Sequence, residues 1–360
     1  MKRKVLFAGT LFLALGVTML LSQQGQQAFS QCWGKFPAFI PMSGVTPRGV
    51  AVDKVGNVYV SVGEVRGDGE HILIWKFKPS GRGPSLFAEI GQGTIGGLAV
   101  GADGHLYVAL AAGVDRGVWR VDRMGHIRLL LGSDQIFFAN GLAFDNRGTL
   151  YITESVSMDS PPAPGPGGIW RIPRRGQAEL CLRDGLLTGT GVLGNIVPIG
   201  ANGIAYYHGN LYVTNTEQGT VVRIRVWPDG SVGLPELWTT LQEVPESPLA
   251  GAPHPVAGDG VALDVHGNLY VAVLTRSAVV RLNLLDKSQE TVAAFCVPDT
   301  LPLYAPLDFP ASLVFGTGKG ERTNLFVTNM GLGAVRVPGL PWSGPGLVKI
   351  HAGAPGRPLH

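Results

Sequence analysis

Charged residues are scarce in this chain of 360 residues, because Asp, Glu, Lys and Arg together make up only 15% of it. The 29 basic and 26 acidic residues nearly cancel, and the formal net charge is +3. Recognition of nucleic acid or of an anionic membrane surface needs clustered excess charge. We therefore expect neither nucleic acid nor a charged membrane surface as a partner.

Cysteine is also rare, and the three cysteines are Cys32, Cys181 and Cys296. Their spacing matches no metal-binding motif. In an exported protein they allow one disulfide and one remaining thiol, and the sequence leaves open which two residues pair.

No stretch of the mature chain shows the periodicity of an amphipathic helix. The chain instead contains 52 Gly and 26 Pro, and both residues are unfavourable inside helices. A helical bundle is thereby excluded. Because 45% of the residues are hydrophobic, a disordered chain is excluded as well. Frequent glycine in an apolar chain favours an all-β fold with many tight turns.

The first thirty residues have the pattern of a secretory signal peptide. Basic residues 2–4 precede an apolar run over residues 5–21, and small residues at Ala28 and Ser30 suit a cleavage site after Ser30. We predict a signal peptide over residues 1–30 and export to the periplasm or the extracellular space. Its removal brings the net charge to zero and leaves no transmembrane segment. An uncleaved N-terminal membrane anchor is the alternative, because the apolar run has about the minimum length for spanning.

One pattern organises the rest of the chain: a short apolar strand, a turn with Gly, and a strand centred on an aromatic residue. It recurs six times, and the copies begin at Arg48, Gly96, Asn140, Asn202, Asp259 and Ala311. A repeat of about 50 residues indicates a stacked or radial architecture. With two further strands in each copy, the sequence predicts a single domain over residues 31–360, an all-β six-bladed β-propeller with four-stranded antiparallel blades.

The two ends of the domain are expected to close the ring. The last repeat has a third strand from Gly346 and little sequence for a fourth, so residues 33–40 would supply its outer strand. Three long loops, at residues 155–168, 186–200 and 244–258, should crowd one face. Binding sites of repeat folds usually lie on such a face.

The first residue of each innermost strand should point into one mouth of the central tunnel. Three consecutive blades carry Asn140, Asn202 and Asp259 there, and converging oxygen atoms suit a hard cation such as Ca²⁺. Asn-Gly and Asp-Gly are also ordinary turn pairs, which offers a purely structural alternative. Because Arg48, Gly96 and Ala311 occupy the same position in other repeats, the turn itself does not require Asn or Asp.

The strings FANGLAFDNRGTLYITES, GANGIAYYHGNLYVTNT, GDGVALDVHGNLYVAV and FPASLVFGTGKGERTNLFVTN carry a family resemblance. They resemble the senescence-marker-protein, gluconolactonase and luciferin-regenerating-enzyme family over nearly the whole mature chain. Paraoxonases, diisopropylfluorophosphatase and strictosidine-synthase-like proteins are similar propellers.

The resemblance implies a catalytic divalent cation at the tunnel mouth, usually Ca²⁺ or Zn²⁺. The family holds it with a Glu from the first blade, two Asn and an Asp. Asn140, Asn202 and Asp259 match the last three, and Asp259 matches the general base or nucleophile. Arg48 stands where the family has Glu. A guanidinium cannot ligate a metal.

Three consequences of Arg48 are open. The side chain could turn outward to pair with a carboxylate, or Glu154 could donate the missing charge to the metal. Alternatively the metal is lost, and Arg48 binds an anionic group of the substrate.

With a cation in place, the resemblance implies polarisation of a lactone or ester carbonyl. Asp259 would accept a proton or attack directly. His254 could position water or transfer protons. Asn215 and Asn329, at the ends of second strands, could reach the substrate.

The function expected from the sequence is that of an exported, metal-dependent lactonase or ester hydrolase acting on a small molecule, with Ca²⁺ favoured over Zn²⁺. The alternative is a non-catalytic propeller similar to the NHL scaffolds, which binds a ligand or a protein and has lost the metal site. Phosphotriester cleavage at the same mouth is a third possibility. No motif specifies the substrate or the oligomeric state.

Overall fold

A computed structural model describes residues 38–42, 44–79, 84–160, 163–195, 197–247, 249–295, 307–331 and 345–358. The predicted signal peptide, Cys32 and Cys296 lie outside these ranges. Within them, Cys181 is a half-buried free thiol. Burial raises the pKa of this thiol to about 11, so it is protonated at neutral pH. No helix in the described ranges has the length and apolarity needed to cross a membrane.

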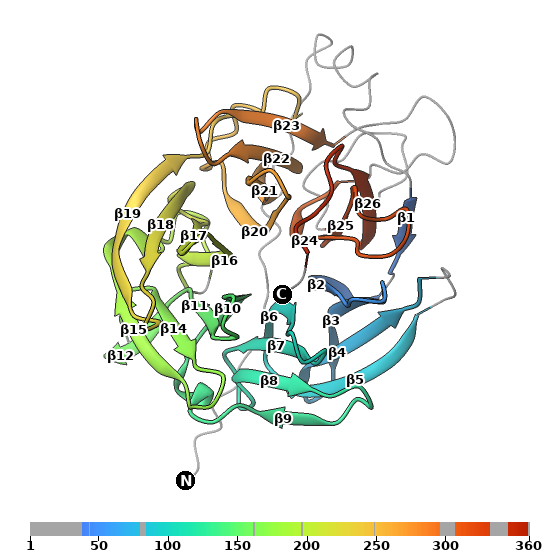
Figure 1. Ribbon diagram of the computed structural model, residues 1–360, viewed down its shortest axis with the longest axis vertical. Coiled ribbons are helices and arrows are strands. Elements are labelled where there is room, and N and C mark those ends of the chain that lie inside the picture. Colours follow the sequence, from blue (N-terminus) through green and yellow to red (C-terminus); the bar gives the residue numbers. More distant parts are fainter. Residues whose placement is uncertain are drawn as a thin grey trace.

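Six four-stranded antiparallel sheets are arranged in a ring around a central channel (Figure 1). Blade one contains β2 (Thr46–Val52), β3 (Val58–Arg66), β4 (Gly69–Phe77) and β5 (Ser85–Gln92). Blade two contains β6 (Thr94–Val100), β7 (Leu106–Ala111), β8 (Gly117–Val121) and β9 (Ile127–Leu129). Blade three contains β10 (Ala139–Phe144), β11 (Leu150–Glu154), β14 (Gly168–Ile172) and β15 (Glu179–Arg183).

The second half of the ring repeats this plan. Blade four contains β16 (Ala201–Tyr207), β17 (Asn210–Asn215), β18 (Thr220–Val226) and β19 (Val232–Thr240). Blade five contains β20 (Gly258–Leu263), β21 (Asn268–Val273), β22 (Ala278–Asn283) and β23 (Gln289–Ala294). Blade six contains β24 (Pro310–Phe315), β25 (Asn324–Asn329), β26 (Gly346–His351) and β1 (Ala38–Pro41). The predicted six-bladed propeller is confirmed.

Short elements lie in the connections between the strands of the blades. A separate hairpin of β12 (Ser157–Ser160) and β13 (Ala163–Gly165) lies within the first long loop. The described 3₁₀ turns are η2 (Ser133–Gln135), η3 (Gly185–Leu187) and η4 (Leu274–Arg276).

The ring closes as the sequence predicts. β1, from the N-terminal side, pairs antiparallel with β26 and forms the outer strand of blade six, with Ala38 opposite Lys349. The first and last parts of the domain therefore share one sheet, which covers an edge that would otherwise be open to other chains.

The aromatic residue of each repeat packs between blades. Tyr107 of blade two meets Phe144 of blade three edge-to-face, with ring centroids 5.0 Å apart. Tyr270 of blade five meets Phe315 of blade six in the same way at 5.1 Å. Edge-to-face pairs add to the stabilisation from buried area alone. The aromatic residue that marks the repeat in the sequence is thus the residue that packs against the neighbouring blade.

Candidate functional site

A β-bulge in the innermost strand of every blade positions the residues at the mouth of the channel. The pairing of the first two strands shifts register just there in all six blades, for example between Ala139 and Leu142, and between Ala201 and Ile204. A bulge redirects the extra side chain. The six residues so placed, here called the ring residues, all line the central cavity and are Arg48, Gly96, Asn140, Asn202, Asp259 and Ala311.

Hydroxyl groups fix the backbone of these ring residues from the neighbouring blade. Thr153 donates its hydroxyl to the carbonyl of Asn202 at 2.6 Å. In the next blade, Thr214 donates to the carbonyl of Asp259 at 2.7 Å. Such bonds are needed because the bulge removes these carbonyls from the strand ladder.

The glycine after each polar ring residue is required by close packing between blades. A Cβ atom on Gly141 would lie 2.3 Å from the Asn202 carbonyl oxygen, and one on Gly203 would lie 2.2 Å from the Asp259 carbonyl oxygen. Neither glycine has a positive φ. The Asn-Gly and Asp-Gly pairs are therefore not turn pairs. The fold requires the glycine, but it does not require a particular side chain at the ring residue before it.

Asp259 is the one carboxylate among the six ring residues. Burial raises its pKa to about 7, although the Arg48 guanidinium and a hydrogen bond from the Asn202 side chain both lower it. The carboxylate is half-buried and faces the cavity. A carboxylate with a pKa near neutrality can accept and return protons at physiological pH.

The two asparagines lie beside Asp259 and are held by hydroxyl side chains. Asn202 is buried, and its amide nitrogen donates to the Thr216 hydroxyl at 3.0 Å. Asn140 donates to the Ser155 hydroxyl at 3.1 Å. The repeat pattern does not predict Ser155 and Thr216 as site residues. They directly follow Glu154 and Asn215, the last residues of the second strands in blades three and four.

Arg48 remains at the mouth instead of turning outward. Its side chain is half-buried on the wall of the cavity, and its charge acts on Asp259. This ring position therefore carries a cation next to a carboxylate, where the resembling family has a second carboxylate.

Glu154 lies outside the cavity and binds three structural donors. Its Oε1 accepts the Phe137 backbone N–H at 2.9 Å. Its Oε2 accepts both Trp170 Nε1 and the Arg183 guanidinium at 2.8 Å. The side chain is completely buried. The structure therefore does not bring Glu154 to the ring residues, and it corrects our placement of this carboxylate as a metal ligand.

Asn215 and Asn329 occupy the equivalent position in blades four and six, and both are completely buried. The amide of Asn215 donates to the carbonyls of Leu186 and Thr188 at 2.9 and 3.0 Å. Asn329 accepts the backbone N–H of Asp308. These side chains hold connecting loops in place, and neither lines the cavity that a substrate would enter.

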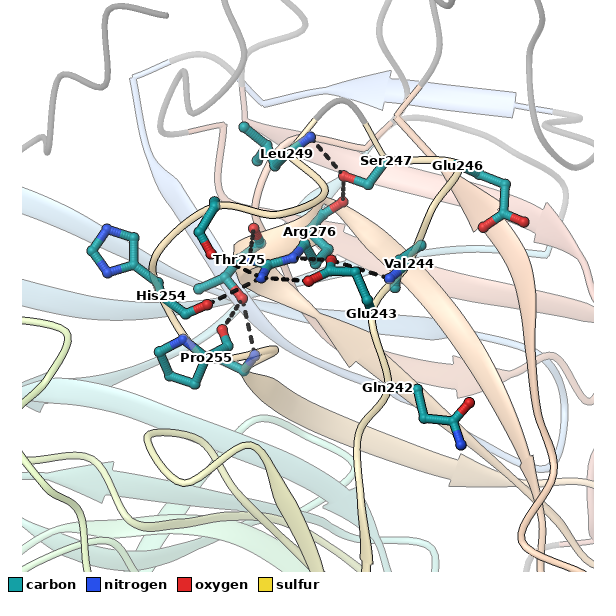
Figure 2. A network of polar contacts seen from close by, with 12 residues as sticks. Gln242, Glu243, Val244, Glu246, Ser247, Leu249, His254, Pro255, Thr275 and Arg276 are labelled. Carbon is teal, nitrogen blue, oxygen red and sulfur yellow. Dashed lines mark hydrogen bonds and ion pairs between the residues drawn. The ribbon is translucent and has the colours of Figure 1, made fainter.

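The buried Arg276 binds the loop that precedes β20 (Figure 2). Arg276 forms an ion pair with Glu243 and donates to the carbonyls of Ala252, His254 and Thr275 at 3.0–3.2 Å. His254 lines the cavity, and Figure 2 shows its ring pointing away from Arg276. The predicted His254 is thus at the mouth, and Arg276 fixes its backbone.

Replacing Glu243 with Gln should lower the free energy of unfolding by about 2 kcal/mol, because the charge of Arg276 would lose its counter-ion. The Arg276 side chain is 2% exposed, whereas that of Glu243 is 41% exposed. Urea denaturation measures the change. Glu290→Gln is the matched control, since its ion pair with Arg281 lies at the surface. Equal effects of the two substitutions would contradict this account of the loop.

The donors at the mouth do not fit a divalent cation. In the described part of the chain, no three Asp, Glu, His or Cys side chains come together in one group. Asp259 is the one carboxylate among the six ring residues, and the positive Arg48 acts on it. Ca²⁺ usually takes several carboxylate oxygens. The cation implied by the resemblance stays a prediction, and no chemical step below uses it.

The cavity extends from the ring residues along the channel, with a volume of about 1520 Å³. Its central walls come from the innermost strands and are apolar, with Val50, Leu98, Leu142, Ile204 and Val261 among the lining residues. A pocket with apolar central walls and polar groups at its mouths is typical of a small-molecule site.

No protein-family model and no curated protein matches the chain. Among solved structures, a luciferin-regenerating enzyme is similar, with a TM-score of 0.61 and 16% identity over 89% of this chain and 97% of that one. A second structure, provisionally named a gluconolactonase, has a TM-score of 0.60 and 15% identity over 93% of this chain and 97% of that one. The chain therefore has the six-bladed fold of these proteins, as the resemblance in its repeats predicts.

Proposed function

We propose that this protein hydrolyses lactones or carboxylic esters at the ring residues, with Asp259 as the general base. The observation that carries the proposal is a carboxylate with a pKa near 7, placed between a guanidinium and an amide at the mouth of a large apolar cavity. The names of the two similar structures, a luciferin-regenerating enzyme and a gluconolactonase, favour an enzyme of small molecules.

The chemistry follows from the side chains present. Ionised Asp259 removes a proton from a water molecule as the water oxygen attacks the acyl carbon. Negative charge develops on the former carbonyl oxygen, and Arg48 stabilises it electrostatically. When the acyl C–O bond breaks, protonated Asp259 returns its proton to the leaving alkoxide. His254, on the loop above, is placed to exchange protons with solvent.

Export is part of the proposal, because residues 1–30 have the pattern of a signal peptide. Metal dependence is not part of it, since the donors at the mouth do not fit a divalent cation. A non-catalytic binding propeller is the second candidate, favoured by the same Arg48.

The Arg48→Gln substitution tests the proposal on a panel of lactones and aryl esters. We expect the wild-type protein to hydrolyse members of the panel, and the variant to lose about tenfold in kcat/KM, because charge stabilisation at the oxyanion is lost. The pH at which activity appears should also rise, since Arg48 no longer lowers the pKa of Asp259. Arg225→Gln, on an exposed part of blade four, is the control. Ligand binding without turnover in any form would favour the binding propeller.

A further inference from the structure

The end of the channel opposite the ring residues, here called the lower mouth, is lined by a cluster of arginines. Arg120 lies on β8 and Arg128 on β9, both in blade two. Arg147, Arg174 and Arg175 lie in two hairpin turns of blade three. All five line the same cavity as the ring residues. Arg120 is half-buried and the other four are exposed.

These arginines form two groups, one on the paired strands of blade two and one at the turns of blade three. Arg120 and Arg128 are directly opposite on the paired strands β8 and β9. Arg174 packs over the β10–β11 turn, with its Cδ 3.6 Å from where a Cβ on Gly148 would lie, next to Arg147. Like charges opposite each other on a sheet are destabilising. The cluster therefore carries a repulsion that a bound anion would relieve.

Nearby carboxylates neutralise only part of this charge. Asp103 lies 3.4 Å from the Arg120 guanidinium and also contacts His105 at 3.0 Å. Asp145 is 4% exposed, and its Oδ1 accepts the backbone N–H groups of Arg147 and Thr149. Among the described residues, Arg128, Arg147, Arg174 and Arg175 form no ion pair with a carboxylate.

The C-terminal segment narrows the lower mouth on its other side. Gly356 bridges to Asp264 in blade five, and the Arg357 guanidinium donates to the carbonyl of Tyr206 in blade four at 3.2 Å. Figure 1 shows this end of the chain near the axis of the ring. The segment lies along blades four to six, so the part of the mouth beside blades two and three stays open to a ligand.

We propose that this arginine cluster binds a small molecule with two or more carboxylate or phosphate groups. A guanidinium forms paired hydrogen bonds with one carboxylate or phosphate at a time. Five guanidinium groups on two strands and two turns therefore suit several anionic groups better than one. The site is separate from the ring residues, and the proposal does not depend on the proposed hydrolysis.

Isothermal titration calorimetry with tripolyphosphate and with citrate tests the site on the full chain, with acetate as the monovalent comparison. We expect saturable binding of at least one of the two polyanions, much weaker binding of acetate, and a fall in affinity with added NaCl. The Arg174→Ala/Arg175→Ala variant should bind at least about tenfold more weakly. Binding by Asp259→Asn should be unchanged, which separates this site from the catalytic proposal.

Arg225→Gln/Arg223→Gln, which removes two charges from blade four, is the matched control and should bind as the wild type does. Circular dichroism shows whether each variant folds. If the control and the test variant lost the same polyanion affinity, the loss would reflect the overall charge of the protein, and the proposal would be overturned. Affinity for acetate equal to that for the polyanions, or the absence of binding at low salt, would also overturn it.

Discussion

The Asp259→Asn protein should fold normally and hydrolyse lactones or esters about 10²–10⁴-fold more slowly than the wild type. Asn has nearly the same shape as Asp but cannot accept a proton, so the loss would fall on kcat. Asp134→Asn, at an exposed position that does not line the cavity, is the control and should keep full activity. Unchanged turnover in Asp259→Asn would show that another group is the base.

The same substitution should change the pH dependence of stability. The pKa of Asp259 is about 7 in the folded protein, against about 3.9 in an unfolded chain. Between these values the folded state binds more protons, so stability falls as the pH rises through this window. Above pH 7, Asp259→Asn should therefore be more stable than the wild type by about 2–4 kcal/mol. Urea denaturation at pH 5 and pH 8 measures the difference, and a more stable wild type at pH 8 would contradict the assignment.

The Gly203→Ala substitution should damage activity without touching a catalytic side chain. The new Cβ atom would lie 2.2 Å from the Asp259 carbonyl oxygen, which is backbone and cannot rotate away. Blade five must shift relative to blade four, and a displacement of about 1 Å in a catalytic group can lower the rate by about 10²-fold. The free energy of unfolding should fall by about 1–3 kcal/mol.

Gly67→Ala is the control for this prediction, because a Cβ there would meet no atom within 4 Å. Kinetics and urea denaturation of both variants give the comparison. If Gly203→Ala were as active and as stable as Gly67→Ala, the close packing between ring residues would not position Asp259.

The architecture could be predicted because the same strand pattern can be recognised in every repeat of the sequence. A strand, a glycine turn and an aromatic strand recur six times, and the aromatic residue is the one that joins blades, as with Tyr107 and Phe144. Closure by β1 followed from counting strands in the last repeat. The position of Asn140, Asn202 and Asp259 on the cavity followed from their equivalent places in three repeats.

The supporting residues could not be predicted in the same way. Glu154 and Asn215 end second strands, and the sequence does not reveal whether such a side chain faces the cavity or the neighbouring loop. Glu154 faces Trp170 and Arg183, whose positions depend on the third and fourth strands of the blade. The reason for the glycine in the Asn-Gly pairs also lies in the neighbouring blade, because the atom nearest to a Cβ on Gly141 would be the carbonyl oxygen of Asn202.

In the proposed mechanism Asp259 acts as a base, and its pKa is near 7 because burial raises the pKa more than Arg48 and Asn202 lower it. The most direct test is the pH dependence of kcat/KM for a neutral lactone or ester, measured with and without a chelator. The account predicts activity that rises with pH through an apparent pKa near 7 and does not change with the chelator. A flat profile between pH 5 and pH 9, or activity lost with the chelator and restored by Ca²⁺, would contradict it.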